Sequence, residues 1–211
     1  MRTRILTAFL LLCPAAAVAG DLAAVALPAP RTEGGMPLMQ ALKLRHSTRE
    51  FDAAKLSPQV LSNLLWAAAG TNRPDGRRTA PTANNRQETD VYLTTADGLF
   101  LYEPKEHRLQ PILGEDIRKL AGMQDFVATA PLNLIFVADY ARMGNGPEAD
   151  KTLYSGAGVG FMAQNVYLFC ASEGLNTVVR AMIDRPVLAK AMKLRPEQHI
   201  VLSQTVGYPK K

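Results

Sequence analysis

Two arginines and a serine alternate along one short segment of the chain, as Arg45, Ser47 and Arg49. In an extended segment, residues two positions apart point to the same side, so these three side chains converge on one target. Arginine guanidiniums match phosphate or carboxylate oxygens, and a serine hydroxyl both donates and accepts hydrogen bonds. The spacing indicates an anion-binding site, although a solvated charged patch explains the same residues taken alone.

Two further segments carry unusual residue types. A long polar loop extends from Thr71 to Glu88, and loops of this length in compact domains are commonly functional or disordered. A long predicted helix from Ser155 to Glu173 contains three glycines, Gly156, Gly158 and Gly160. Each glycine destabilises a helix by roughly 1 kcal/mol relative to alanine. The glycines therefore indicate close approach of another element, from the same subunit or from a second one.

The elements that must position these residues mix helices and strands without regular alternation. Ser57 and Pro58 are typical of a helix start, and Ala96-Asp97-Gly98 is typical of a hairpin turn. Apolar periodicity predicts helices over residues 37–44, 57–69, 116–130, 155–173 and 186–192, and strands over 91–95, 99–102, 132–138, 177–179 and 199–206. This pattern favours an α+β domain, with helices around a small, mostly antiparallel sheet.

Residues 1–19 have the pattern of a secretory signal peptide. Arg2 and Arg4 precede an apolar stretch, and Ala17-Val18-Ala19 forms a small-residue cleavage site. We expect export, to the periplasm in a bacterium, followed by a flexible lead-in over residues 20–35 and one domain over 36–211. The apolar stretch is too short to span a bilayer, so no membrane association is expected after cleavage.

Composition narrows the range of partners. Loss of Arg2 and Arg4 lowers the formal net charge from +5 to +3, a mildly basic balance that suits an anionic cofactor. The sequence has no Lys/Arg-rich run with interleaved aromatic residues, which argues against nucleic acid. The three histidines are scattered, which argues against a metal site. Only Cys170 remains after cleavage, so an intramolecular disulfide is excluded.

Four motifs in order resemble the nitroreductase family of FMN enzymes. Arg45-His46-Ser47-Thr48-Arg49-Glu50-Phe51-Asp52 resembles the opening motif, and Pro81-Thr82-Ala83-Asn84-Asn85-Arg86-Gln87 the second flavin motif. The stretch Ala163-Gln164-Asn165 in the glycine-bearing helix resembles the central helix, and Gly207-Tyr208-Pro209-Lys210 the end of the domain. The resemblance covers residues 36–211.

The resemblance implies a nitroreductase-like FMN-binding fold and a homodimer with FMN at its interface. The Arg45 segment of one subunit would hold the phosphate and ribityl chain, and the Pro81 loop would come from the other. The central helix would lie in the dimer core, with Gln164 and Asn165 buried and hydrogen-bonded. The implied FMN-binding residues are Arg45, His46, Ser47, Arg49, Pro81, Thr82, Ala83, Asn85, Gln124, Val179, Arg180 and Lys210.

Several of these residues depart from the family pattern. Thr82 and Ala83 stand where serines are common, so one hydroxyl contact is expected to be missing. Arg180 either adds charge near the ring or lies at the surface, whereas a backbone amide near Val179 is expected to meet flavin N5. Lys210 is expected to replace a basic residue that longer relatives supply.

The implied activity is that of an FMN-dependent oxidoreductase. Electrons would pass from a donor such as NAD(P)H through FMN to a small nitro, quinone or enone acceptor, by a ping-pong mechanism without a nucleophilic side chain. Because nicotinamide cofactors are scarce outside the cytoplasm, the electron donor could also be a compound other than NAD(P)H. Two alternatives are a flavin dehydrogenase that oxidises azoline-type substrates and a flavin-binding protein without turnover.

Overall fold

A seven-stranded sheet forms the centre of the molecule. The computed structural model describes residues 23–210, so the predicted signal peptide lies outside the described residues. The strands are β1 (Val25–Ala26), β2 (Thr89–Thr95), β3 (Gly98–Glu103), β4 (Arg108–Leu113), β5 (Leu132–Asp139), β6 (Asn176–Arg180) and β7 (Gln198–Gly207). Their order is β1-β4-β3-β2-β5-β7-β6, and all neighbouring strands are antiparallel. The predicted α+β class with an antiparallel sheet is confirmed.

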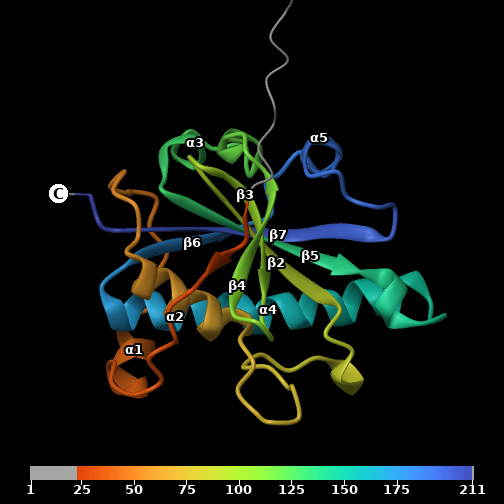
Figure 1. Cartoon of the computed structure of the whole chain (residues 1–211), viewed down its shortest axis with the longest axis horizontal. Helices are drawn as coiled ribbons and strands as arrows, with labels where there is room; N and C mark the ends of the chain where they lie inside the picture. The colour runs from red at the N-terminus through yellow and green to blue at the C-terminus, as the bar shows by residue number, and fades with distance from the viewer. Residues whose placement is uncertain (1–22, 211) are drawn as a thin grey trace, which may run out of the picture.

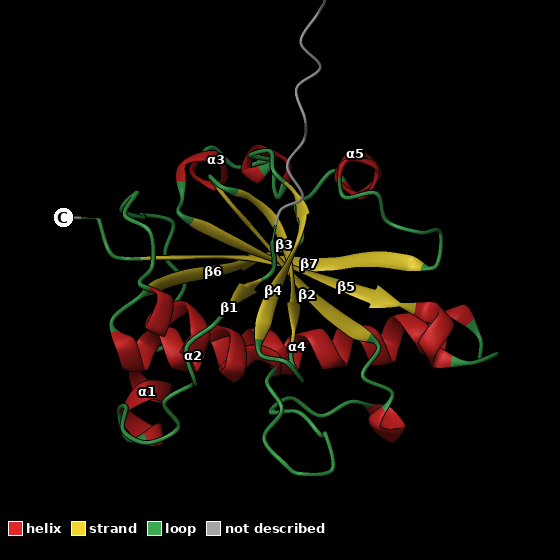
Figure 2. Cartoon of the chain, viewed as in Figure 1, coloured by secondary structure: helices red, strands yellow, loops and turns green. Residues whose placement is uncertain are grey.

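Helices cover both faces of this sheet (Figures 1 and 2). They are α1 (Leu38–Leu44), α2 (Pro58–Ala69), α3 (Phe126–Thr129), α4 (Glu148–Glu173) and α5 (Arg185–Ala191). α2 and α4 pack with the sheet around the larger apolar core, and α3 and α5 border a smaller core on the opposite face. In the described part of the chain, no helix is long and apolar enough to cross a membrane.

Local residue types explain where the two longest helices begin and end. The Ser57 hydroxyl accepts a hydrogen bond from the Val60 amide at 3.3 Å, which caps the start of α2. α4 ends at Gly174, whose φ of 68° is the left-handed conformation that glycine adopts at least cost. α4 begins at Glu148, earlier than predicted, because residues 148–154 are mostly exposed and therefore lack apolar periodicity.

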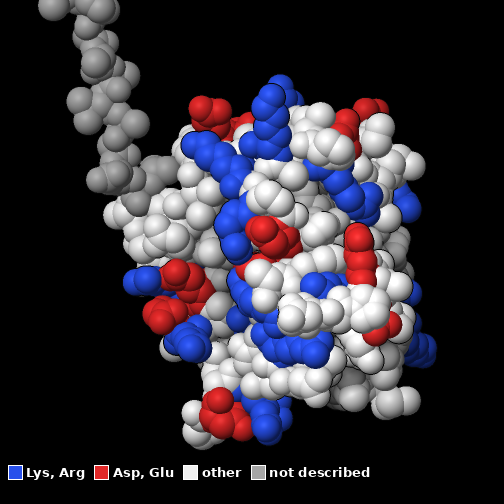
Figure 3. Space-filling model, turned by 90° about the vertical axis from the view of Figure 1, so that its right-hand side faces the viewer, with Lys and Arg blue, Asp and Glu red and all other residues white. Residues whose placement is uncertain are grey.

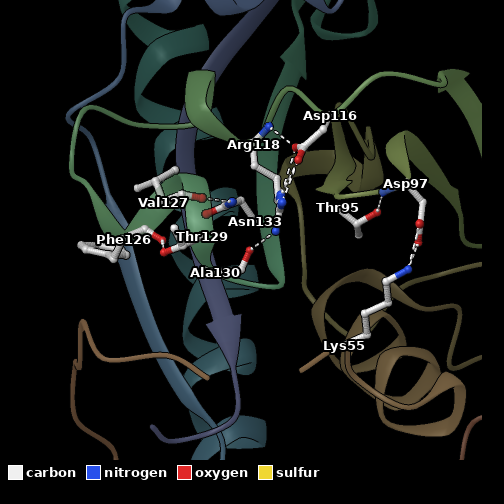
Figure 4. Close-up of polar contacts among 10 residues, drawn as sticks. All are labelled: Lys55, Thr95, Asp97, Asp116, Arg118, Phe126, Val127, Thr129, Ala130 and Asn133. Carbon is white, nitrogen blue, oxygen red and sulfur yellow. Dashed lines mark hydrogen bonds and ion pairs between the residues drawn. The ribbon is translucent and has the colours of Figure 1, made fainter. Parts of the chain in front are cut away.

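The helix predicted over residues 116–130 is wrong, because only a short 3-10 turn and α3 form there. Figure 4 shows the polar contacts that hold this segment instead. The Arg118 guanidinium lies 2.7 Å from the Asp116 carboxylate and donates to the Ala130 carbonyl at 3.0 Å. These contacts draw residue 118 towards the end of the segment, so tertiary hydrogen bonds replace those of a continuous helix.

Residues 23–35, the described part of the predicted flexible lead-in, are held against the domain. β1 pairs with β4, and the Arg31 amide donates to Asn63 of α2 at 2.9 Å. The Met36 amide donates to the Ser172 hydroxyl of α4 at 2.7 Å. This segment is therefore part of the fold and not a free linker.

His107, in the turn between β3 and β4, also fixes the lead-in. Its Nε2 lies 2.7 Å from Ser62 Oγ and 3.1 Å from the Pro28 carbonyl oxygen, and its Nδ1 lies 2.9 Å from the Tyr102 hydroxyl. Burial lowers the pKa of His107 below its ordinary value of 6.5, because the charged ring loses hydration. The folded state therefore favours the neutral ring.

Figure 3 shows the face that lies on the right in Figure 1, where α4 begins. Positively and negatively charged side chains are mixed on this face. Just before α4, Arg142 lies 2.5 Å from Asp90 of β2, and this ion pair raises the pKa of Arg142. Arg195 lies 2.5 Å from Asp139 at the end of β5. Because both carboxylates are largely buried, these pairs hold the strand ends more firmly than exposed pairs would.

The stability of the fold should fall as the pH decreases through the His107 titration. The unfolded chain takes up a proton near pH 6.5, whereas the folded chain does so only at lower pH, so acid favours unfolding across that interval. The melting temperature measured between pH 7.5 and pH 5 should decline in the unsubstituted protein and decline less in His107→Gln. His46→Gln, which changes an exposed histidine, should keep the full decline; an unaltered pH profile in His107→Gln would contradict this assignment.

Candidate functional site

Residues 45–50 run along the free edge of β6. β6 is the last strand of the sheet, so β7 pairs with only one of its edges. The Thr48 amide donates to the Thr177 carbonyl at 3.1 Å, and the Asn176 side chain donates to the Glu50 carbonyl at 2.7 Å. The segment forms no regular secondary structure of its own, and these bonds hold it beside the sheet.

Tyr167 of α4 joins this segment to β6. Its hydroxyl accepts a hydrogen bond from the Val179 amide at 3.0 Å and lies 2.7 Å from Ser47 Oγ. The Arg45 guanidinium carbon lies 5.0 Å from the centroid of its ring. Arg45 and Ser47 therefore meet at one tyrosine that is only 7% exposed. Sequence reasoning missed Tyr167 because it occupies an ordinary inward position of a long helix.

Arg45 and Arg49 carry positive charges that no carboxylate neutralises within residues 23–210. Arg49 is exposed, and Arg45 is half-buried over the tyrosine ring. The cation–π contact orients Arg45 without neutralising it. Both guanidiniums are therefore available to bind an anion.

Lys210 and His46 lie at the margins of this cluster. A β-bridge between Phe51 and Pro209 places the exposed Lys210 next to the Arg45 segment. His46 is exposed, and its Nδ1 lies 2.6 Å from the Leu44 carbonyl oxygen. Lys210 thus extends the basic cluster, whereas the His46 ring is engaged with its own backbone.

The second predicted motif, Pro81–Gln87, forms a tight loop. Asn84, Asn85 and Gln87 adopt positive φ values of 53°, 53° and 49°, which are uncommon for residues other than glycine. The Thr82 hydroxyl accepts from the Gln87 amide at 3.0 Å, and the Asn85 side-chain oxygen accepts from the Gln87 side chain at 3.0 Å. Such strain is typical of functional loops and persists only where side chains enforce it.

The two motifs contact α4 at different places (Figure 1). A Cβ atom on Gly158 would lie 3.9 Å from the Thr82 side chain, whereas the Arg45 segment meets α4 at Tyr167. Positions 158 and 167 are nine residues apart, which corresponds to about 14 Å along a helix. Within one chain, the two predicted half-sites therefore meet α4 more than two helical turns apart.

The outward side of α4 and the neighbouring α1 expose several large apolar side chains, namely Leu38, Met39, Leu42, Leu153, Tyr154 and Phe161. Cβ atoms on Gly156 and Gly160 would meet no heavy atom within 4 Å, so packing inside this chain does not explain these glycines. The half-buried Asn165 donates to the Ala67 carbonyl at 3.0 Å, and Gln164 is exposed in the single chain, so its predicted burial in a dimer stays a prediction. An apolar surface of this kind marks a site of association.

Glu88 was not predicted as a site residue. Its carboxylate is buried, with the residue 1% exposed, and neither oxygen has a hydrogen-bond partner in the described chain. A Cβ on Gly158 would lie 3.6 Å from Glu88 Oε1, so the carboxylate lies beneath α4 next to the Pro81 loop. The only sequence signal was an acidic residue directly before an apolar strand.

The Arg180 side chain lies inside the domain, so the alternative that places it at the surface is wrong. It is 5% exposed, donates to the Ala121 carbonyl at 3.0 Å and to the Asn133 side chain at 3.0 Å, and packs against Phe126. Burial lowers the pKa of Arg180 to about 10, which still leaves it charged at neutral pH. Because the Ala121 loop has no strand to hold it, this guanidinium fastens it to the sheet.

Gln124 lies in the same loop, which reaches the residues that follow β6. The Met123 amide donates to the Met182 carbonyl at 3.2 Å, so the half-buried Gln124 lies near the turn after β6. Met123 and Met182 are 68% and 58% exposed. The loop and the turn thus each expose one large apolar side chain close to the backbone bond that joins them.

Comparisons with known proteins identify the family and the fold. The family model described as "Nitroreductase family" matches residues 42–208. A nitroreductase-family protein of Methanocaldococcus jannaschii is 33% identical over 169 residues, which cover 72% of this chain and 85% of that protein. A crystal structure of such a protein from Ralstonia eutropha is 45% identical, with a TM-score of 0.86, and covers 95% of this chain and 96% of the other.

A more distant structure shares the fold. A nitroreductase-family protein of Desulfovibrio desulfuricans in complex with FMN is 21% identical, with a TM-score of 0.61, over 85% of this chain and 89% of the other. At this identity the likeness concerns the fold alone. The flavin belongs to that protein's structure.

Gly122→Ala should destabilise the protein by about 1–3 kcal/mol, the usual cost of overpacking a core. The added Cβ would lie 1.8 Å from Arg180 Nη1 and would push the guanidinium off its acceptors. Urea unfolding should show this loss, and the loss should shrink in an Arg180→Met background. Gly146→Ala, whose Cβ would meet nothing within 4 Å, is the control; equal effects of the two alanines would contradict the predicted clash.

Proposed function

Because the chain belongs to the nitroreductase family, we propose that it is an FMN-dependent oxidoreductase. The observation that carries this proposal is the pair of unneutralised guanidiniums, Arg45 and Arg49, set on either side of Ser47 along the free edge of β6. Phosphate needs positive charge and hydroxyl donors, and this cluster provides both. FMN, when bound, supplies electron transfer from a donor such as NAD(P)H to a small nitro, quinone or enone acceptor, in two half-reactions at one site.

The residues present fit that cofactor. Arg45, Arg49 and Lys210 would bind the phosphate and place positive charge near the polar edge of the ring. Ser47 would hydrogen-bond the bound group from the same side. The turn after β6 and the Gln124 loop, with an exposed methionine on each, would cover apolar surface and limit access of water. No side chain is required as a nucleophile, so the protein's part is binding, orientation and exclusion of water.

The same proposal includes a homodimer whose subunits complete one another's sites. The Pro81 loop is held away from the Arg45 cluster of its own chain, on the side of α4 where the apolar surface lies. Packing the α4 surfaces of two copies would cover Phe161 and place a second backbone over Gly156 and Gly160. It would also bring the Pro81 loop of one copy towards the Arg45 cluster of the other.

Arg49→Ala and Arg45→Ala should each weaken FMN binding by about 1.5–3 kcal/mol, or roughly 10- to 150-fold, because each removes a charged hydrogen bond to the phosphate. Titration followed by quenching of flavin fluorescence measures the affinity, with Lys190→Ala on the remote α5 as the control. Unchanged affinity in both arginine variants would mean that the phosphate binds elsewhere. Anaerobic bleaching of the bound flavin by NADH or NADPH separates a reductase from a flavin carrier.

Phe161→Glu should convert the dimer to a monomer, because it places a charge in the centre of the α4 surface. Size-exclusion chromatography with light scattering gives the mass, and FMN affinity should fall with the loss of the second half-site. Val187→Glu on α5 is the matched control, since Val187 and Phe161 are 47% and 49% exposed. A Phe161→Glu protein that stays dimeric and binds FMN normally would place the interface elsewhere.

A further inference from the structure

We propose that Tyr167 is the positioning residue of the cofactor half-site and that it sets Ser47 as a hydrogen-bond donor. This inference rests on the proposed FMN function. Tyr167 contacts three separate parts of the half-site: the guanidinium of Arg45, the hydroxyl of Ser47 and the amide of Val179. No other side chain in the described structure touches all three.

The direction of the hydrogen bonds follows from the chemistry of the groups. The Val179 amide can only donate, so the Tyr167 oxygen accepts from it at 3.0 Å. The phenol hydrogen then needs an acceptor, and Ser47 Oγ at 2.7 Å is the one that the described residues provide. If Ser47 donated to Tyr167 instead, the phenol hydrogen of a residue only 7% exposed would be left without a partner, which is costly.

The favoured chain of hydrogen bonds therefore runs from Val179 through Tyr167 to Ser47. Ser47 is exposed, so its own hydroxyl hydrogen is left free to donate to a ligand. A donor at this place suits an acceptor oxygen, such as a phosphate oxygen or a ring carbonyl. Ser47 Oγ keeps a second lone pair, so it can still accept from a ligand hydroxyl while its own hydrogen is donated.

The tyrosine also explains why the hydroxyl and the guanidinium face the same target. The ring holds Arg45 through a cation–π contact, and the hydroxyl holds Ser47 two residues later. Tyr167→Phe removes only the hydroxyl contacts. Tyr167→Leu removes both and should also release Arg45.

A double-mutant cycle tests this inference. Tyr167→Phe and Ser47→Ala should each weaken FMN binding by roughly threefold to tenfold, the scale of one neutral hydrogen bond. The double variant should be no weaker than either single variant, because both changes remove the same donor. Tyr140→Phe, which removes a hydroxyl bonded to Thr152 at 3.2 Å far from the site, should bind FMN normally. Additive losses, or no loss in Tyr167→Phe, would overturn the inference.

A second measurement needs neither FMN nor a stable Tyr167 variant. The Val179 amide lies on a free strand edge, and Tyr167 is its acceptor there. In the unsubstituted protein this amide should exchange slowly with deuterium by NMR, and fast exchange would overturn the inference. If the unsubstituted protein fails to bind FMN, the proposed function fails, whereas fast exchange of the Val179 amide would overturn the tyrosine contact without reference to FMN.

Discussion

The free edge of β6 is the constraint on which the rest of the site depends. An unpaired strand edge presents amides and carbonyls that must find partners. Here the main chain of Thr48 and the hydroxyl of Tyr167 supply them, at 3.1 Å and 3.0 Å. Closing the edge in this way holds the Arg45 segment without a strand of its own. The side chains of the segment are thus left available for a ligand, while its backbone is fixed.

α4 supplies the second constraint, because one helix serves both the core and the surface. Its inward residues, among them Val159 and Met162, are fully buried against the sheet. Its outward side carries exposed apolar groups and glycines that meet nothing in this chain. The tyrosine at position 167 joins these roles, since it is anchored by the core and its hydroxyl reaches the site.

Local patterns in the sequence predicted a large part of this fold. The Ser57 cap, the hairpin at Asp97 and the buried strand β5 each depend on neighbouring residues, and each is confirmed. β4 was missed because Pro111 interrupts its alternation, and the helix over residues 116–130 was wrong because Arg118 bonds to groups distant from its own turn. Elements whose boundaries depend on tertiary contacts are those that a local pattern cannot supply.

The arginines of the site also show that a local sequence pattern does not reveal tertiary contacts. Arg45 lies beside β6, and Arg180 is the last residue of that strand. From the sequence, both arginines were candidates to place positive charge near FMN. In the structure, their side chains meet different surroundings on different sides of β6. Arg45 lies over an aromatic ring at the open edge, where its charge is left for a ligand. The Arg180 side chain is buried, where its guanidinium donates to a backbone carbonyl and a side-chain amide oxygen. These bonds hold the Ala121 loop against the sheet. What separates the two arginines is the tertiary partner that each side chain meets, and a local sequence pattern does not supply that partner.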